Sequence, residues 1–176
     1  MSWLTQGEKV LKTYRRNLFR QKFEPDALFL ARLIRAGDVC VDVGASYGRF
    51  VYLMSRAAGA EGKVVAFEPG DESYAILKVL CRLHGLKNTQ CVKKAVSFKV
   101  GAINLTIPVK LNQGKRLGHS LAYISEGENP TAKIEKIQTT TLDLFWGTTS
   151  LPKIDFIKCD VEGAEAWVLE GARETL

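Results

Sequence analysis

The sequence predicts an α/β protein with an open, doubly wound parallel sheet. Three observations favour this fold: short β-branched runs alternate with segments of helical periodicity, a glycine-bracketed turn follows the first run, and an acidic residue ends the second. The 176 residues, 46% of them hydrophobic, suffice to bury one core. No apolar run approaches the ~20 residues needed to cross a bilayer, and no secretory signal is visible, so we expect a cytoplasmic protein.

The N-terminal part is predicted to be helical. Residues 1–23 are basic and carry apolar side chains near helical spacing, which is typical of an amphipathic helix. This helix would pack on the rest of the protein or touch an anionic membrane surface. Residues 24–176 would form the main domain. Its first helix would run from Pro25 to Gly37, because proline suits a first helical turn and glycine suits a helix stop.

The core is expected to begin with Val-Cys-Val-Asp-Val at residues 39–43, a run without polar alternation before Asp42. Such runs are typical of parallel strands that are covered on both faces. The same reasoning places strands at residues 63–68, 90–96 and 154–160, and helices from Phe50 to Gly59, from Asp71 to Gly85 and from Ala164 to Leu176.

Residues 98–142 break this alternation of strands and helices. Within them, residues 102–107 and 136–141 alternate polar and apolar side chains, as half-exposed strands do. Loops with glycine and asparagine separate the two segments. We therefore expect an antiparallel excursion beside the parallel sheet.

The segment VDVGASYGRF, residues 41–50, is the most informative one. Gly44 and Gly48 bracket the turn from strand to helix, and glycine permits positive φ and close approach of a ligand to the backbone. The following helix N-terminus offers free N–H groups to a carboxylate. Glu68 ends the next strand, where it can accept hydrogen bonds from both hydroxyls of a ribose. The pattern indicates a nucleoside site.

Two ligand classes share this layout. The dinucleotide fingerprint is GxGxxG, whereas this chain has GASYG at residues 44–48, with Ser46 in place of the second glycine. Asp42 would repel a pyrophosphate, but it suits a ligand that carries an ammonium group. S-adenosylmethionine has an amino acid tail and no phosphate, so the residues favour this methyl donor over NAD. A tight turn without a ligand is the plain alternative.

Five segments resemble the FkbM methyltransferase family in order and spacing, from about residue 24 onward. They are DVGASYG at 42–48, AFEPG at 66–70, AVS at 95–97, TLD at 141–143 and, most specifically, IKCDVEGAE at 157–165. The resemblance implies a Rossmann-like class I methyltransferase fold. It also implies transfer of a methyl group from S-adenosylmethionine to oxygen, often a hydroxyl of a sugar or natural product. Ser46 and Tyr47 depart from the pattern, because the family commonly shows asparagine and a small or aliphatic residue there.

Donor-binding roles follow from the motif and the resemblance. Asp42 would orient the amino group, Glu68 would hold the ribose, and Pro69 would shape the chain beside the adenine. The cradle would consist of Gly44, Ala45, Ser46 and Gly48, while Ala95 and Ser97 would flank the adenine.

The acceptor side would rest on the acidic segment after the fourth core strand. Methyl transfer to oxygen needs an aligned hydroxyl and a base, and a positioned base contributes about 10²–10⁴-fold. Asp160 and Glu162 are candidates for that base, and His119 is a third candidate, in the loop-rich excursion. With Glu165 the carboxylates would also suit a divalent metal, although no histidine or further carboxylate is clearly placed to complete such a site. Solvated loop residues are the alternative.

The charge distribution bears on the partners. Residues 1–36 hold eight basic and three acidic side chains, and residues 92–117 hold six basic and none acidic. Aromatic residues do not interleave with these zones as base stacking requires, and the acidic loop at 160–163 would repel phosphates, which argues against a nucleic-acid partner. We expect a small-molecule or glycan acceptor with a free hydroxyl. A non-catalytic S-adenosylmethionine or nucleotide binding module is the alternative.

In the family, further strands should follow the helix that begins at Ala164, so we expect a fold truncated at its C-terminus. The fourth core strand would then be an exposed sheet edge, which a homo-oligomer could cover. The four cysteines form no CxxC pair and are expected to be reduced thiols.

Overall fold

The computed structural model describes residues 29–30, 32–108, 111–112, 115–116, 123–124, 132–151 and 153–176. The predicted helix of residues 1–23 and the candidate base His119 lie outside these residues, so both stay predictions, as does the domain boundary at residue 24. Residues 29–30 and 32–33 are helical, in agreement with the helix expected there. Gly37 follows with a φ of 92°, which glycine adopts at little cost.

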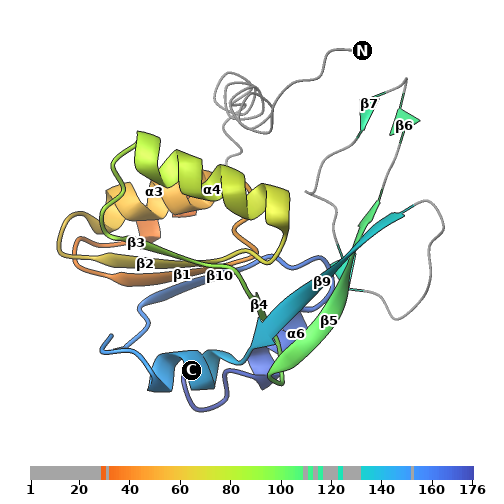
Figure 1. Ribbon diagram of the computed structural model, residues 1–176. Helices are drawn as coiled ribbons and strands as arrows, with labels where there is room; N and C mark the ends of the chain where they lie inside the picture. Colours follow the sequence, from red (N-terminus) through yellow and green to blue (C-terminus); the bar gives the residue numbers. More distant parts are fainter. Residues whose placement is uncertain are drawn as a thin grey trace.

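A four-stranded parallel sheet forms the centre of the fold, as the sequence predicts (Figure 1). Its elements are, in chain order, β1 (Val39–Val43), α3 (Arg49–Ala58), β2 (Lys63–Phe67), α4 (Asp71–Leu83), β3 (Thr89–Val92), α5 (Leu142–Gly147), β10 (Phe156–Cys159) and α6 (Glu165–Glu170). The strands stand in the order β10-β1-β2-β3, and every neighbouring pair is parallel. Helices α3 and α4 cover one face and α6 lies on the other (Figure 1), which confirms the doubly wound α/β fold.

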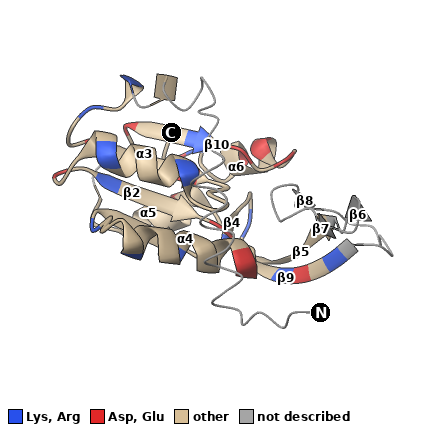
Figure 2. Ribbon diagram, turned by 90° about the horizontal axis from the view of Figure 1, so that it is seen from above, with Lys and Arg blue, Asp and Glu red and all other residues tan. Residues whose placement is uncertain are grey.

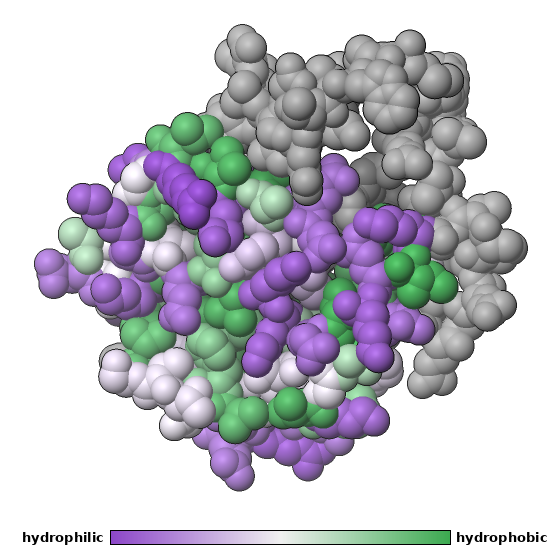
Figure 3. Space-filling view, viewed as in Figure 1, coloured by the Kyte–Doolittle hydropathy of each residue, from purple (hydrophilic) through white to green (hydrophobic). Residues whose placement is uncertain are grey.

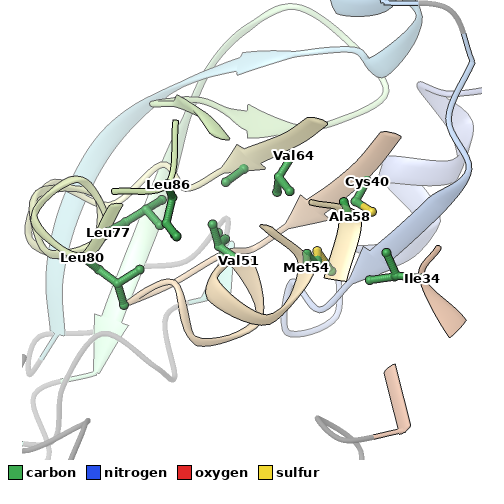
Figure 4. Close-up of a cluster of buried hydrophobic side chains, with 11 residues drawn as sticks. Ile34, Cys40, Val51, Met54, Ala58, Val64, Leu77, Leu80 and Leu86 are labelled. Atoms are coloured by element: carbon green, nitrogen blue, oxygen red, sulfur yellow. The ribbon is translucent and has the colours of Figure 1, made fainter. Parts of the chain in front are cut away.

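Apolar side chains fill both sides of this sheet. Cys40 of β1 belongs to the cluster under α3 and α4, with Met54 and Leu77 among its members (Figure 4). Val41 and Val43 belong to the cluster on the opposite side, with α5 and α6. Because successive side chains of a strand point to opposite faces, the side chain of Asp42 lies on the α3 side, in line with Cys40.

A second sheet carries the antiparallel excursion, which is confirmed. Its strands are β4 (Ala95–Val96), β5 (Gly101–Pro108), β8 (Tyr123–Ile124) and β9 (Ala132–Thr140), in the order β4-β9-β5-β8. The long pair β5 and β9 is antiparallel from Gly101 opposite Thr139 to Pro108 opposite Ala132. A short hairpin of β6 (Leu111–Asn112) and β7 (Lys115–Arg116) extends from it (Figure 1).

The prediction of a single strand over residues 90–96 is wrong, because the structure has two strands there, β3 and β4. The chain pairs with β2 as far as Val92, leaves the parallel sheet, and pairs with β9 from Ala95. The break falls at the two lysines 93 and 94, whose charged side chains do not suit a strand covered on both faces. The Lys93 ammonium instead lies 2.6 Å from the Asp71 carboxylate, at the start of α4.

The helix predicted from Ala164 to Leu176 is shorter, and the helix α5 was not expected. Helix α6 ends at Glu170, and turns follow it. A Cβ atom on Gly171 would come within 2.1 Å of the Ser97 carbonyl oxygen. The backbone at Gly171 thus packs closely against the backbone at Ser97, directly after the end of α6. Asp143 of α5 then accepts hydrogen bonds from the backbone N–H groups of Glu174 and Thr175, which holds the last described residues in place.

The outer surface mixes polar and apolar side chains. Figure 3 shows hydrophobic and hydrophilic residues interspersed on one face. Strand β10 is an edge of the parallel sheet in the described part of the chain, and its side chains are half-buried. Coverage of this edge by a second copy stays a prediction. None of the helices among the described residues combines the length and apolar character that crossing a bilayer requires.

Candidate functional site

The loop after β1 is held against the end of β2. The backbone N–H groups of Gly44 and Ala45 both donate to the Phe67 carbonyl, at 3.0 and 2.9 Å. Gly44 takes a φ of 81°, and a Cβ atom there would meet the Asp160 carbonyl oxygen at 2.1 Å. Glycine is therefore required at this position twice over, by the backbone angle and by the approach of the chain that follows β10.

The loop ends at Gly48, which caps the N-terminus of α3 with a φ of 83°. A Cβ atom on Gly48 would lie 2.6 Å from the Leu77 side chain, so α3 begins in close contact with α4. Between the two glycines, Ser46 has a φ of 49°, a backbone conformation that residues other than glycine rarely adopt. Such conformations concentrate where a chain serves a ligand or a switch.

Glu68 connects this loop to α4. Its side chain is buried, and Oε2 accepts a hydrogen bond from the Ser46 N–H at 2.8 Å. Oε1 accepts from the Gly70 N–H at 2.9 Å and from the Ser73 hydroxyl at 2.6 Å. A carboxylate offers about four acceptor positions, so these three bonds leave it one for a ligand hydroxyl rather than two. Pro69 follows directly, half-buried at the turn into α4.

Asp42 is the most buried carboxylate of the site. Its side chain has no exposed surface, and Oδ1 lies 3.2 Å from the Lys158 ammonium. Within the described part of the chain, Oδ2 is buried without a hydrogen-bond partner. Burial raises the pKa of Asp42 to about 6, although the charge and hydrogen bond of Lys158 lower it. A buried oxygen without a donor costs about 1–3 kcal/mol, so this position is suited to a ligand that brings one.

Lys158 is a site residue that the sequence analysis missed. It stands in β10, opposite Asp42 in the register of the two parallel strands. Its ammonium lies 3.2 Å from Asp42 Oδ1, 3.6 Å from Asp160 Oδ2 and 4.8 Å from the centre of the Phe50 ring of α3. The signal was present in the sequence, because a lysine interrupts the otherwise apolar run FIKC.

The acidic segment after β10 contains one carboxylate that is bound to the backbone, Glu165, and two that are exposed, Asp160 and Glu162. Glu165 Oε1 accepts hydrogen bonds from the backbone N–H groups of Val161 and Gly163, and backbone N–H groups hold its pKa below the usual range. Asp160 and Glu162 are exposed, and Glu162 has a φ of 54°. Figure 2 shows this acidic loop beside the basic end of β10. Glu165 thus shapes the loop, and the exposed pair faces solvent.

Ala95 and Ser97 serve the packing of the second sheet. Ala95 belongs to a cluster with Leu105, Ile107 and Ile137. The buried Ser97 donates its N–H to the Thr140 carbonyl at 2.8 Å and lies against Gly171. Their placement beside an adenine stays a prediction.

The chemistry of the site favours a nucleoside with a cationic tail. The structure brings the Asp42 and Glu68 carboxylates to the ends of neighbouring strands β1 and β2, on either side of the loop 44–48. An unpaired buried carboxylate oxygen accepts an ammonium and repels a phosphate. The residues that are present therefore fit an amino-acid-bearing nucleoside better than a dinucleotide.

Comparison with known proteins agrees with this geometry. Residues 42–176 match the family described as the methyltransferase FkbM domain. The structure of the FkbM methyltransferase from Methylobacillus flagellatus is similar over 85% of this chain and 36% of its own, with 16% identity and a TM-score of 0.52, which shows a shared fold. No curated protein matches the chain.

Two further solved structures are similar over about half of this chain. A SAM-dependent methyltransferase from Aquifex aeolicus has 22% identity and a TM-score of 0.39, over 53% of this chain and 49% of its own. A SAM-dependent O-methyltransferase from Thermotoga maritima has 23% identity and a TM-score of 0.40, over 52% of this chain and 34% of its own. The matched region thus spans less than half the length of each of these proteins.

Proposed function

Because the chain belongs to the FkbM methyltransferase family over residues 42–176, we propose that it is an S-adenosylmethionine-dependent O-methyltransferase acting on a hydroxyl group of a sugar or other small molecule. The observation that carries the proposal is the Asp42 carboxylate, fully buried with one oxygen lacking a partner among the described residues. The α-ammonium of the donor would supply the missing hydrogen bond and charge.

The rest of the donor has matching groups. Glu68 keeps one acceptor position for a ribose hydroxyl, and its other bonds hold the carboxylate in a fixed orientation. Pro69 and Gly70 carry the chain from this carboxylate into α4. The loop from Gly44 to Gly48 ends at the N-terminus of α3, and a helix N-terminus favours a carboxylate such as that of the donor's tail.

The acceptor would approach from the side of Asp160. When bound, S-adenosylmethionine supplies an electrophilic methyl group on a sulfonium sulfur. Asp160 would accept the proton of the acceptor hydroxyl while the hydroxyl oxygen takes the methyl carbon, whose bond to sulfur breaks so that S-adenosylhomocysteine leaves. The Asp160 side chain is 63% exposed, so an acceptor can reach it, and Lys158 at 3.6 Å helps to fix its position. Glu162 adds negative charge, which disfavours phosphate-bearing acceptors.

Calorimetry tests the donor part of this proposal. S-adenosylmethionine and its demethylated product S-adenosylhomocysteine should bind, and NADH and ATP should not. Asp42→Asn and Glu68→Gln should each weaken binding at least tenfold, which corresponds to about 1.4 kcal/mol. Glu61→Gln, an exposed carboxylate in the turn after α3, is the matched control and should bind like the parent. Preference for NADH, or full affinity in both site variants, would overturn the assignment.

A panel of hydroxyl acceptors tests the transfer step. Release of S-adenosylhomocysteine that depends on a sugar or small-molecule hydroxyl, and that falls in Asp160→Asn without loss of donor affinity, supports the O-methyltransferase. Donor binding without release on any acceptor would favour the alternative, a non-catalytic donor-binding module.

A further inference from the structure

The Asp42 carboxylate must be ionised to bind an ammonium, yet its surroundings oppose ionisation. The side chain has no exposed surface, and burial is the main cause that raises its pKa to about 6. Near neutral pH this places the group close to the point at which it takes up a proton. A neutral carboxyl group attracts an ammonium far less than a carboxylate does.

The charged groups around Asp42 come from two strands. At the end of β2 stands Glu68, and beyond β10 stands Asp160; both are negative and raise the pKa of Asp42 further. Lys158 of β10 acts in the opposite direction, at 3.2 Å from Oδ1. Helix α3 contributes the Phe50 ring, whose face lies 4.8 Å from the Lys158 ammonium. Lys158 is thus the cation that offsets two neighbouring carboxylates and the loss of water.

The lysine also determines which oxygen of Asp42 is open. Its ammonium takes Oδ1, while Oδ2 stays buried without a partner in the described structure. The lysine side chain is itself only 13% exposed and lies between Asp42 and the 63% exposed Asp160. It therefore cannot turn freely into solvent, and the arrangement presents a single carboxylate oxygen to a ligand.

From this geometry we propose that Lys158 is a positioning residue for the methyl donor: it keeps Asp42 ionised and occupies Oδ1, so that Oδ2 receives the donor's ammonium. The inference rests on the proposed function for the identity of the ligand, but its test concerns protons rather than turnover.

The consequence is a pH window for donor binding. Affinity falls on the acid side as Asp42 is protonated, and on the alkaline side as the donor's α-amino group, with a pKa near ~8, loses its proton. A nearby opposite charge lowers a carboxyl pKa by about 1–3 units. Removing Lys158 should therefore shift the acid limb, which is the part of the affinity curve that falls as Asp42 is protonated, to a higher pH by a similar amount. The pH range over which the donor binds is then narrower without Lys158, and the highest affinity within that range is lower.

Calorimetry with S-adenosylhomocysteine between pH 5 and 9 measures this window in the parent, Lys158→Met and Lys158→Arg. Repeating each titration in two buffers of different ionisation enthalpy counts the protons released or taken up. Lys153→Met is the matched control, because Lys153 is 80% exposed and pairs with Asp155 at 2.7 Å. 5′-Methylthioadenosine, which lacks the amino acid tail, reports on the nucleoside part of the site alone.

The expected result is an acid limb shifted upward by at least one pH unit in Lys158→Met, with proton release on binding at pH 7 that the parent lacks. Lys158→Arg and Lys153→Met should keep the parent limb, and 5′-methylthioadenosine should bind all variants equally. An unshifted limb in Lys158→Met, with normal 5′-methylthioadenosine binding, overturns the inference and leaves the methyl donor assignment intact. If neither nucleoside binds the parent protein, the proposed function itself is wrong. Should Lys158→Met melt early, Lys158→Gln provides the second neutral variant for the same titration.

Discussion

The Asp160 backbone lies directly against Gly44, so that a Cβ atom on the glycine would approach the Asp160 carbonyl oxygen to 2.1 Å. This contact joins the loop after β1 to the segment after β10, the two places where the sequence carries its most specific motifs. The glycine loop after β1 and the acidic loop after β10 are therefore packed against each other.

The first prediction concerns Gly44→Ala. The added methyl group meets the Asp160 carbonyl, and the φ of 81° is strained for alanine. Overpacking costs about 1–3 kcal/mol, and the strain adds to it, so we expect the free energy of unfolding to fall by about 2 kcal/mol or more in urea denaturation. Gly37→Ala is the control, since its φ is 92° with no atom near the new Cβ. Equal losses in both variants would show that the contact contributes nothing.

The second prediction concerns the pH dependence of stability without donor. The pKa of Asp42 is about 6 in the folded protein and 3.8 in the unfolded chain, so the folded state binds more protons between these values. Asp42 therefore lowers stability as pH rises from about 4 to 6, by up to ~3 kcal/mol. Asp42→Asn should remove that fall, so the stability of the variant relative to the parent should rise between pH 4 and pH 7. Urea denaturation of both proteins at pH 4, 5, 6 and 7 measures the difference; parallel curves would contradict the burial of an ionisable Asp42.

The third prediction assigns Asp143 a structural role. Its Oδ1 accepts hydrogen bonds from the Glu174 and Thr175 N–H groups and from the Thr175 hydroxyl, at 3.1, 2.9 and 2.6 Å. Asp143→Ala should lower the free energy of unfolding by about 1–3 kcal/mol, because it leaves these donors unpaired. Glu170→Ala removes only an exposed pair with Arg173 and should change stability by less than ~0.5 kcal/mol. An Asp143 variant as stable as the Glu170 variant would refute this role.

The fourth prediction concerns thiol reactivity. Cys91 and Cys81 have sulfur atoms 3.7 Å apart, and the hydrogen bond between them lowers the pKa of Cys91. Burial raises the pKa of Cys40 to about 12 and that of Cys159 to about 11. Iodoacetamide at pH 7.5 should therefore alkylate Cys91 first, because the thiolate is the reactive form.

Peptide mass mapping over time measures the order of alkylation. Cys81→Ser keeps a hydroxyl donor beside Cys91 and should slow the alkylation of Cys91 only modestly. Cys81→Ala removes that donor and should slow the alkylation of Cys91 clearly. Faster labelling of Cys159 than of Cys91 would show that exposure, not the thiol pair, controls reactivity.

Much of the fold was predictable because its cause is local. The strand β1 was expected at its observed bounds, since a β-branched run ending at a glycine turn has few other solutions. Asp42 and Glu68 were identifiable because carboxylates that end neighbouring apolar strands beside a glycine turn are typical of a nucleoside site. The sequence also predicted that helices end at three glycines, and each of these glycines has a positive φ angle, which is common after a helix: Gly37, Gly59 and Gly85.

The missed features depend on contacts between distant segments. Lys158 acquires its role from the register that places it opposite Asp42, which the sequence does not reveal. The end of α6 is set by the approach of Gly171 to the Ser97 carbonyl, a contact across more than seventy residues. The short α5 has too few residues for a periodic pattern to emerge. Local patterns therefore indicated the carboxylates Asp42 and Glu68, but not Lys158, the cation that pairs with Asp42.

The pairing of Asp42 with Lys158 joins the first and the last strand of the parallel sheet, 116 residues apart in the chain. During synthesis, β1, β2 and β3 emerge with the glycine loop long before the lysine does. A nascent chain at that stage would lack the cation that pairs with Asp42. On the proposed role of Lys158, full affinity for the methyl donor would be a late acquisition in assembly, and it would report that β10 has taken its place beside β1.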